Sequence, residues 1–481
     1  MHYRSISRRK ALVWGAAGVV GALAPRAKAA RRDADVLILG AGIGGLHAAR
    51  MLQDAGLVVE VLEGSERIGG RCWTARDVPG RPELGAQQIG FGYGRVRGNA
   101  AELGVQLVDP MVGSVAETRQ PQIAVSISGH TPTMPWADSP FNTLRSDEKP
   151  FPPSALFNRY LMKDEPLVDL QDWLKPKFAH LDQLSLRQIL ARNGASEEAL
   201  RLMEIGVAAS SLDDGSALDF IRKRHLFAWE AKAGSYHEFK EGTSAITDAM
   251  AASLKRQVKM KKLVTHIHTT KNGVSIRSQD GAQYRARACI STIPLSIFKD
   301  ISVQGSVTAL QRECWREIRY NHLVQIFFKP QKRFWESDGL PATMWSDGPL
   351  ELILHIPSRT DPNGVMLAYV NGLGADRLGK MSDDALKTFA MDELCRMRPA
   401  ARGSVEVSYI HNWSTYPFSK GHIAHFAPGG VTRYADVMMQ PAGALFFAGE
   451  HCSRIGSGLE GACESAEDAS IKIMDLLGSG R

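Results

Sequence analysis

Beyond its first thirty residues, the chain opens on a short apolar run that changes abruptly into glycines. Residues 35–39 read Asp-Val-Leu-Ile-Leu, and residues 40–45 include four glycines. Residues 46–55 then have helical composition and contain no proline. An apolar, β-type run that ends at glycines is typical of a buried strand. The pattern therefore predicts a strand, a tight turn and a helix in direct succession.

The glycines of this turn suit a phosphate group. Gly40 permits the turn, Gly42 lets the main chain approach a pyrophosphate, and Gly45 lets the helix pack on the strand. The helix N-terminus faces the anion with the positive end of its dipole. A second β-type run at 57–62 ends at Glu63, close to the spacing expected for an acid that accepts hydrogen bonds from a ribose. Together these features predict a Rossmann-like α/β fold that binds a dinucleotide.

The residues that follow Glu63 favour FAD over NAD. Residues 67–71 read Arg-Ile-Gly-Gly-Arg and resemble the loop that runs under the pyrophosphate in flavin-containing amine oxidases. Gly69 and Gly70 free the backbone to face phosphate, and Arg71 can pair with phosphate through two hydrogen bonds. The resemblance implies that the cofactor is FAD, and we expect it to be held noncovalently.

Further segments resemble the same family, the superfamily of monoamine and amino acid oxidases, and they follow in the family's order. Residues 83–89 resemble the segment along the isoalloxazine ring, and Val264 lies where a valine backbone contacts adenine. Residues 447–450 and 458–462 resemble the closing motif, in which Glu450 holds the ribityl-phosphate region. The cofactor-binding residues that we infer from the motifs and the resemblance are Gly40, Gly42, Gly44, Gly45, Glu63, Gly70, Arg71, Gly85, Ala86, Gln87, Gln88, Val264, Gly449, Glu450, Gly458 and Leu459.

The order of these motifs predicts two interleaved domains, and a length of 481 residues is too great for one compact core. The resemblance implies a discontinuous, Rossmann-like FAD-binding domain of the GR2 type. It also implies an α+β substrate-binding domain that contains a mixed sheet and helices. We expect the FAD-binding domain at 33–95, 240–298 and 430–481, and the substrate-binding domain at 96–239 and 299–429.

The first part of the substrate-binding domain changes character along its length. Residues 182–209 carry leucines and isoleucines at helical spacing, which predicts helices. Residues 121–153 are rich in proline, serine and aspartate, which predicts a loop. We expect this loop to border the substrate entrance; the alternative is a peripheral insertion.

The resemblance implies oxidation of a C–N bond by hydride transfer to flavin N5, a reaction that needs no nucleophile and no metal. Most members place a lysine near N5, where it holds a water, and the alignment puts Gln325 there. A register error would bring in Lys329 or Lys332 instead, but the later pair Phe334-Trp335 supports Gln325. A neutral amide lends no positive charge to reduced flavin or superoxide. A c-type cytochrome or a quinone is therefore an alternative electron acceptor to O2.

Two positions that flank the substrate amine with aromatic rings in the family carry different residues here. The resemblance places Ile423 and Gly458 at them, so a cage of ring faces is missing and the site should admit a larger substrate. Trp413 is expected to line the cavity or to lie in the core. His422 falls where some members attach FAD through a cysteine, and it would line the cavity or link to the flavin. These four residues and Gln325 are the candidate catalytic positions.

The charge of the chain comes largely from its first thirty residues. Of the formal net charge of +7, six basic residues lie there without any acid, which leaves about +1 for the rest, so no nucleic-acid partner is indicated. Paired Arg8 and Arg9, an apolar stretch at 11–24 and the small residues around 27–29 resemble a twin-arginine signal peptide over 1–30. This predicts a periplasmic protein without a membrane span, the alternative being an uncleaved anchor.

The six cysteines are scattered and form no C-x-x-C, so we expect buried thiols and no metal site. The preferred hypothesis is an exported, FAD-dependent amine oxidase or dehydrogenase that acts on a small-molecule amine. An amino acid oxidase is disfavoured because Gln88 stands where such enzymes place an arginine, although Arg95 and Arg97, a few residues on, could substitute. Two competing hypotheses are a desaturase or isomerase acting on C–C bonds and a scaffold protein with a structural flavin. The sequence is compatible with a homodimer.

Overall fold

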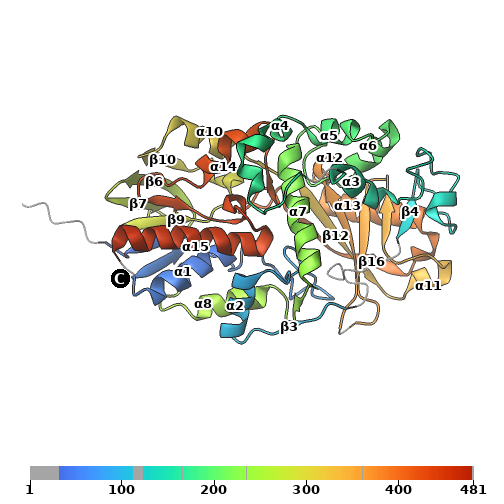
Figure 1. The fold of residues 1–481 in the computed structure, drawn as a ribbon. Helices are drawn as coiled ribbons and strands as arrows, with labels where there is room; N and C mark the ends of the chain where they lie inside the picture. The colour runs from blue at the N-terminus through green and yellow to red at the C-terminus, as the bar shows by residue number, and fades with distance from the viewer. Residues whose placement is uncertain (1–31, 112–122, 164–165, 235, 360, 479–481) are drawn as a thin grey trace, which may run out of the picture.

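The computed structural model describes residues 32–111, 123–163, 166–234, 236–359 and 361–478. The predicted signal peptide, with Arg8 and Arg9, lies outside the described residues. Figure 1 shows two lobes, with a nucleotide-binding type of sheet on the left and a larger sheet with helices on the right. Each lobe contains a sheet whose strands are far apart in the sequence, while the domain bounds inferred from the motifs stay a prediction.

The left lobe is built on a parallel sheet in the order β18-β9-β1-β2. Its strands are β1 (Val36–Leu39), β2 (Val59–Leu62), β9 (Ala288–Ser291) and β18 (Leu445–Phe447). Every residue of β1 is buried, as a parallel strand covered on both faces requires. Helices α1 (Ile43–Asp54) and α15 (Gly458–Leu477) pack side by side on one face. The predicted strand, turn and helix are confirmed.

A second sheet, in the order β10-β6-β7-β8, covers the other side of this lobe. Its strands are β6 (Val264–Thr270), β7 (Gly273–Ser278), β8 (Gln283–Ala286) and β10 (Ser302–Gly305). Strand β6 alternates between buried and exposed residues, and it places His266 and His268 together on the exposed face. Strand β10 pairs with β6. It begins just beyond residue 298, where the sequence analysis ends the middle segment of the FAD-binding domain.

The right lobe contains a mixed sheet in the order β16-β12-β15-β14-β13-β4. The strands are β4 (Ala124–Ser126), β12 (Leu323–Pro330), β13 (Met344–Ser346), β14 (Leu352–Ile356), β15 (Val365–Asn371) and β16 (Val405–Asn412). All neighbours pair antiparallel except β13 and β4. Strand β12 pairs with β15 on one side and β16 on the other, and its residues 323–328 are all buried.

Helices cover the upper side of the right lobe, and one long helix stands between the lobes (Figure 1). The covering helices are α3 (Pro153–Leu161), α4 (Ala179–Asp182), α5 (Leu186–Arg192), α6 (Glu197–Glu204), α12 (Gly372–Leu378) and α13 (Asp383–Met397). The helices predicted within 182–209 are confirmed by α5 and α6. Helix α7 (Ala217–Ala233) runs between the lobes and starts at the N-cap Ser216. The side-chain oxygen of Ser216 accepts from the N–H of Asp219.

The remaining elements are short and lie at the edges of the two lobes. They are α2 (Gly94–Glu102), β3 (Leu107–Val108), β5 (Glu238–Phe239), α8 (Ser244–Ala252), α9 (Leu295–Phe298), α10 (Ala309–Glu317), β11 (Arg319–Tyr320), α11 (Phe334–Asp338), β17 (Ala424–His425) and α14 (Gly430–Met438), together with short 3-10 turns. No helix of the described residues is long and apolar enough to cross a membrane.

The packing of α1 on β1 gives a direct test of the first glycines. In Gly45→Ala, the new Cβ would lie 2.1 Å from the carbonyl oxygen of Gly40, a backbone atom that cannot move aside cheaply. We expect the free energy of unfolding to fall by about 3 kcal/mol or more, measured by denaturant unfolding. In the control Gly98→Ala, within α2, the added Cβ meets nothing within 4 Å, so stability should stay the same or rise slightly. Equal losses in the two variants would contradict this account of the turn.

Candidate active site

One cavity of about 690 Å³ is lined by residues of both lobes. Its size suits a cofactor together with a small substrate. It is lined by every predicted cofactor-binding residue except Gly45, and by all five candidate catalytic positions: Gly40, Gly42, Gly44, Glu63, Gly70, Arg71, Gly85, Ala86, Gln87, Gln88, Val264, Gln325, Trp413, His422, Ile423, Gly449, Glu450, Gly458 and Leu459. Gly45 lies behind the turn, where it permits close packing of helix on strand, as its place in the motif implies.

Glycine backbones form the part of the cavity predicted to hold the pyrophosphate. Gly40 and Gly70 have φ angles of +103° and +58°, which L side chains rarely adopt. An added Cβ at Gly70 would lie 3.3 Å from the Cα of Gly42, because Gly42 and Gly69 form a bridge between the two loops. Side chains here would fill the cradle, so its shape fits a phosphate group that is bound by main chain.

Glu63 is fixed at the end of β2 by two backbone donors. The N–H of Ala41 donates to Oε2 at 2.7 Å, and the N–H of Ser65 donates to Oε1 at 2.8 Å. Each carboxylate oxygen keeps a further lone pair. Glu63 is buried and lines the cavity, so it is oriented to accept hydrogen bonds from ribose hydroxyls. The glycine cradle and this carboxylate fit FAD.

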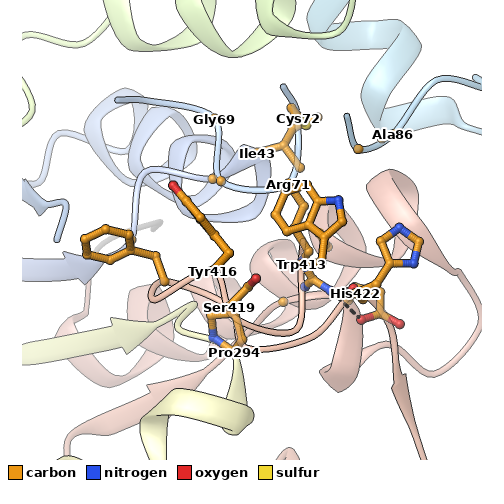
Figure 2. A pocket seen from close by; sticks show the side chains of 18 of the residues that line it. Ile43, Gly69, Arg71, Cys72, Ala86, Pro294, Trp413, Tyr416, Ser419 and His422 are labelled. Atoms are coloured by element: carbon orange, nitrogen blue, oxygen red, sulfur yellow. Dashed lines mark hydrogen bonds and ion pairs between the residues drawn. The ribbon is translucent and has the colours of Figure 1, made fainter. Parts of the chain in front are cut away.

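Arg71 joins three distant segments beside the cavity. Its Nη1 lies 3.4 Å from Oε2 of Glu450 and donates to the carbonyl oxygen of His422. Figure 2 shows Arg71, Trp413 and His422 gathered at one end of the cavity, with Gly69 farther along. Since Nη1 is engaged, the two-bond phosphate contact predicted for Arg71 would have to use Nε and Nη2.

Gln325 is held in one orientation by a tryptophan. It is only 2% exposed and lies opposite Tyr369 of β15 and His411 of β16 in the sheet. The indole Nε1 of Trp413 donates to Oε1 of Gln325 at 3.0 Å and to the carbonyl of Leu84 at 2.8 Å. An indole N–H can only donate, so the amide oxygen must face it. The amide NH2 is therefore the group that Gln325 offers to the cavity.

The two lysines considered for the position of Gln325 lie elsewhere. Lys329 bonds to Asp361 and, at 3.3 Å, to the carbonyl of Gly364, while Lys332 is exposed. Neither lines the cavity, and of the three only Gln325 does. Of the alternatives considered, only the register with Gln325 puts a side chain on the cavity wall; its place beside the flavin stays a prediction.

Trp413 has both roles that its sequence context allows. It is fully buried and also lines the cavity. Its ring meets those of Trp73, His411 and Tyr416 edge to face, with centroids 4.5–6.3 Å apart. This packing fixes the indole N–H that orients Gln325.

His422 is an uncharged lining residue. Burial, together with the cation of Arg71, lowers the pKa of His422 to about 3. Burial and Arg67 likewise lower the pKa of His411 to about 4. The hydroxyl of Tyr369 lies 3.4 Å from Nδ1 of His422. At neutral pH this end of the cavity therefore presents neutral imidazole and phenol groups.

Ile423 and Gly458 line the cavity without rings, as the alignment predicts. Gly458 has a φ of +51°, and an added Cβ there would approach only the hydroxyl of Tyr93, at 3.9 Å. Besides rings within the motif segments, the wall includes the aromatic Tyr93, Tyr369 and Phe227 and the apolar Leu354 and Leu367. The motifs do not mark these five residues, because they lie on strands β14 and β15, on helix α7 and just before α2.

The arginines considered as carboxylate partners do not line the cavity. Arg95 lies 3.0 Å from Glu460 and 2.7 Å from Glu467, both on α15. Nη1 of Arg97 lies 3.1 Å from the ring of His237. Neither arginine takes the place that Gln88 leaves without a cation, so the expectation that they could substitute is wrong.

The segment 121–153 is mostly irregular, as predicted, apart from β4 and a turn at Trp136–Asp138. Its residues 121 and 122 lie outside the described residues. The rest borders the far edge of the six-stranded sheet, where β4 pairs with β13. None of residues 123–153 lines the cavity, so the expectation that this loop borders the substrate entrance is wrong. The loop belongs to the sheet edge because its one strand is bonded there.

All six cysteines are free and buried, which confirms the prediction of buried thiols. Within the described residues there is no group of three or more metal-type side chains.

Comparisons with known proteins identify the family of this chain. The sequence pattern of the family described as "Flavin containing amine oxidoreductase" matches residues 43–474. The chain belongs to this family. It is therefore an oxidoreductase, its cofactor is FAD, and the family's chemistry is the oxidation of amines.

Individual relatives of this oxidoreductase are distant but cover most of its length. The flavin-containing amine oxidase of Danio rerio is 26% identical over 92% of this chain and 86% of its own. The flavin-containing amine oxidase B of Homo sapiens is 24% identical with the same coverage. Cyclohexylamine oxidase from Brevibacterium oxydans has a TM-score of 0.77 at 22% identity and covers 93% of this chain and 100% of its own. Putrescine oxidase bound to putrescine has a TM-score of 0.74 at 21% identity, covering 92% and 99%. The two structures support the fold.

The neutral state of His422 predicts a pH dependence of stability. The unfolded chain takes up a proton near pH 6.5, whereas the folded chain resists it until about pH 3, so stability falls as the pH drops between these values. In His422→Gln, the loss in unfolding free energy between pH 7 and pH 4.5 should shrink by roughly 2 kcal/mol. Denaturant unfolding of wild type and variant at both pH values measures this. An identical loss in the two proteins would show that His422 is not held neutral by the fold.

Proposed function

We propose that this oxidoreductase oxidises the C–N bond of a monoamine whose body is uncharged and largely apolar. The product is an imine, which water hydrolyses to a carbonyl compound and ammonia or a smaller amine. When bound, FAD supplies the hydride acceptor at its N5. The observation that carries the proposal is the chemistry of the cavity wall, whose described residues offer apolar and neutral polar groups and no charge that is free of a partner.

The charged side chains on the wall are already engaged. The pairs are Glu63 with two backbone N–H groups, Glu83 with the hydroxyls of Thr74 and Thr243, Arg67 with the carbonyls of Ile68 and Gly70, Arg71 with Glu450, Lys262 with Asp280, and Lys420 with Asp300. A diamine would bring a second cation, and an amino acid a carboxylate, into this space. Burying a charge without a partner is costly, so both classes should be poor substrates.

The protein's own contribution is to orient the reacting amine and to exclude water. The NH2 of Gln325, held by Trp413, is placed to donate a hydrogen bond near the reacting end of the cavity. Leu354 and Leu367 cover the cavity beside it, and dry surroundings strengthen each polar contact. Because His422 is neutral, it does not repel an amine that enters in its protonated form. The amine must then lose this proton before hydride can leave its α-carbon.

The same proposal includes the location, the acceptor and the state of the cofactor. The twin-arginine pattern of residues 1–30 supports export to the periplasm, which N-terminal sequencing of periplasmic protein would test.

The uncharged Gln325 supports a c-type cytochrome or a quinone as acceptor besides O2. We propose that FAD is noncovalent, because His422 rather than a cysteine stands at the position where some members of the family attach the cofactor. Acid precipitation should then leave the flavin in the supernatant.

An anaerobic panel of compounds tests the proposed reaction. We expect cyclohexylamine and 2-phenylethylamine to bleach the flavin absorbance near ~450 nm. Putrescine and L-leucine should do so with at least about tenfold lower efficiency, because each buries an unpaired charge. Bleaching by a saturated cyclic ketone, with no response to any amine, would instead support a desaturase. Preference for putrescine or leucine would overturn the assignment of an uncharged substrate.

Gln325 gives a separate test of the electron acceptor. In Gln325→Lys, a cation replaces the amide and can stabilise superoxide, so oxidation of the reduced enzyme by air should accelerate about tenfold or more. The control Gln325→Met removes the amide without adding charge and should show no acceleration. Stopped-flow mixing of reduced enzyme with aerated buffer measures the rates. If the wild type reacts with air as fast as Gln325→Lys, the dehydrogenase part of the proposal fails.

A further inference from the structure

Helix α7 carries a buried ion cluster beside the cavity. Asp219 is 1% exposed and faces two cations on its own helix. The Nζ of Lys223 lies 2.8 Å from Oδ2, and Nη1 of Arg222 lies 3.6 Å from Oδ1. None of the three residues lines the cavity. Removing charges from water is expensive unless the groups also have good hydrogen-bond partners, so the further partners of this cluster are informative.

The lysine side of the cluster holds the segment that carries Ile423. Lys223 Nζ donates to the carbonyl of Ala424 at 2.9 Å, and Ala424 directly follows Ile423. Oδ2 of Asp219 accepts from the N–H of Phe426 at 3.2 Å. The cluster therefore fixes the main chain on which one wall of the substrate cavity is built.

The arginine side holds the segment that leads to Gly458. Arg222 Nη2 donates to the carbonyls of Ser453 and Gly456, each at 3.2 Å. The guanidinium lies 4.1 Å from the ring centroid of Trp173, whose own N–H donates to the carbonyl of Arg454 at 2.9 Å. Gly458 follows two residues after Gly456 and lines the cavity, so this contact fixes a second wall segment.

We propose that Asp219, Arg222 and Lys223 are positioning residues that set the width of the substrate cavity. Arg222 and Lys223 are neighbours on one turn of α7, so a single rigid element spaces the two walls. Phe227, on the same helix, lines the cavity itself. The two wall segments carry Ile423 and Gly458, the positions without aromatic rings. The distance between these segments then decides which amine bodies fit. This inference rests on the proposed amine chemistry only for its consequence in substrate choice.

Loss of Arg222 should loosen the loop without unfolding it. Glu464 of α15 binds the same loop from the FAD side, accepting from the N–H of Arg454 at 3.1 Å and of Gly456 at 2.9 Å. A matched control lies on the same turn of α7. Arg224 lies over the ring of Phe157, 5.3 Å from its centroid, and among the described residues it bonds to neither wall segment.

The test compares Lys223→Met, Arg222→Met and the control Arg224→Met as FAD-loaded enzymes. Hydrogen–deuterium exchange should rise at least about threefold in residues 423–426 for Lys223→Met and in 453–458 for Arg222→Met, because each segment loses an anchor. Arg224→Met should change neither segment. Unchanged exchange in both segments would overturn the proposal, whether or not any amine is oxidised.

Substrate choice supplies the second readout. For Lys223→Met and Arg222→Met, the ratio of kcat/KM for a bulky amine over a slim one should shift about tenfold, since small displacements near reacting atoms are costly. Lys223→Arg, which keeps the charge and the donor, should restore the wild-type ratio. A purely structural role would lower Tm and leave the ratio unchanged, which would overturn the inference. Failure of every amine to reduce wild type would instead count against the proposed function.

Discussion

The contact of Arg71 with Glu450 and with the carbonyl of His422 is the interaction on which the site depends. Arg71 ends the glycine loop after β2, Glu450 follows β18 near the end of the chain, and His422 belongs to the other lobe. A guanidinium that is largely removed from water needs such partners, and satisfying them brings three distant segments to one point. All three segments line the cavity, which is therefore built from residues of both lobes.

The same dependence on distant partners runs through the substrate side. Gln325 differs from the lysine that the family resemblance implies, but its effect comes from Trp413, which occupies the amide oxygen and leaves the NH2 as the group offered to the cavity. His422 differs from a charged histidine because burial and Arg71 together keep it neutral. In each case a side chain from another segment sets a property of the residue. Trp413 sets the orientation of the Gln325 amide, and Arg71 helps to keep His422 uncharged.

Although Ile423 and Gly458 depart from the family pattern, the cavity still has walls of defined shape. The cavity wall still includes the rings of Tyr93, Tyr369 and Phe227, which come from elements that carry no motif. The two wall segments are also tied to α7 through charged hydrogen bonds. The cavity thus combines a family cofactor site with walls whose shape depends on packing between the lobes.

The sequence by itself determined the cofactor half of this protein, because its signals are local. Glycines at 40–45 and 69–70 and the acid at Glu63 act through backbone conformation and spacing within one turn or strand, which neighbouring residues set. The alignment also predicted the position of Gln325, which the structure places on the cavity wall. The tertiary structure alone decided that Tyr369 lies beside Gln325, that Arg95 is held by α15, and that residues 123–153 lie away from the cavity. Strand pairing and ion pairing join residues tens to hundreds of positions apart, so no local pattern records them.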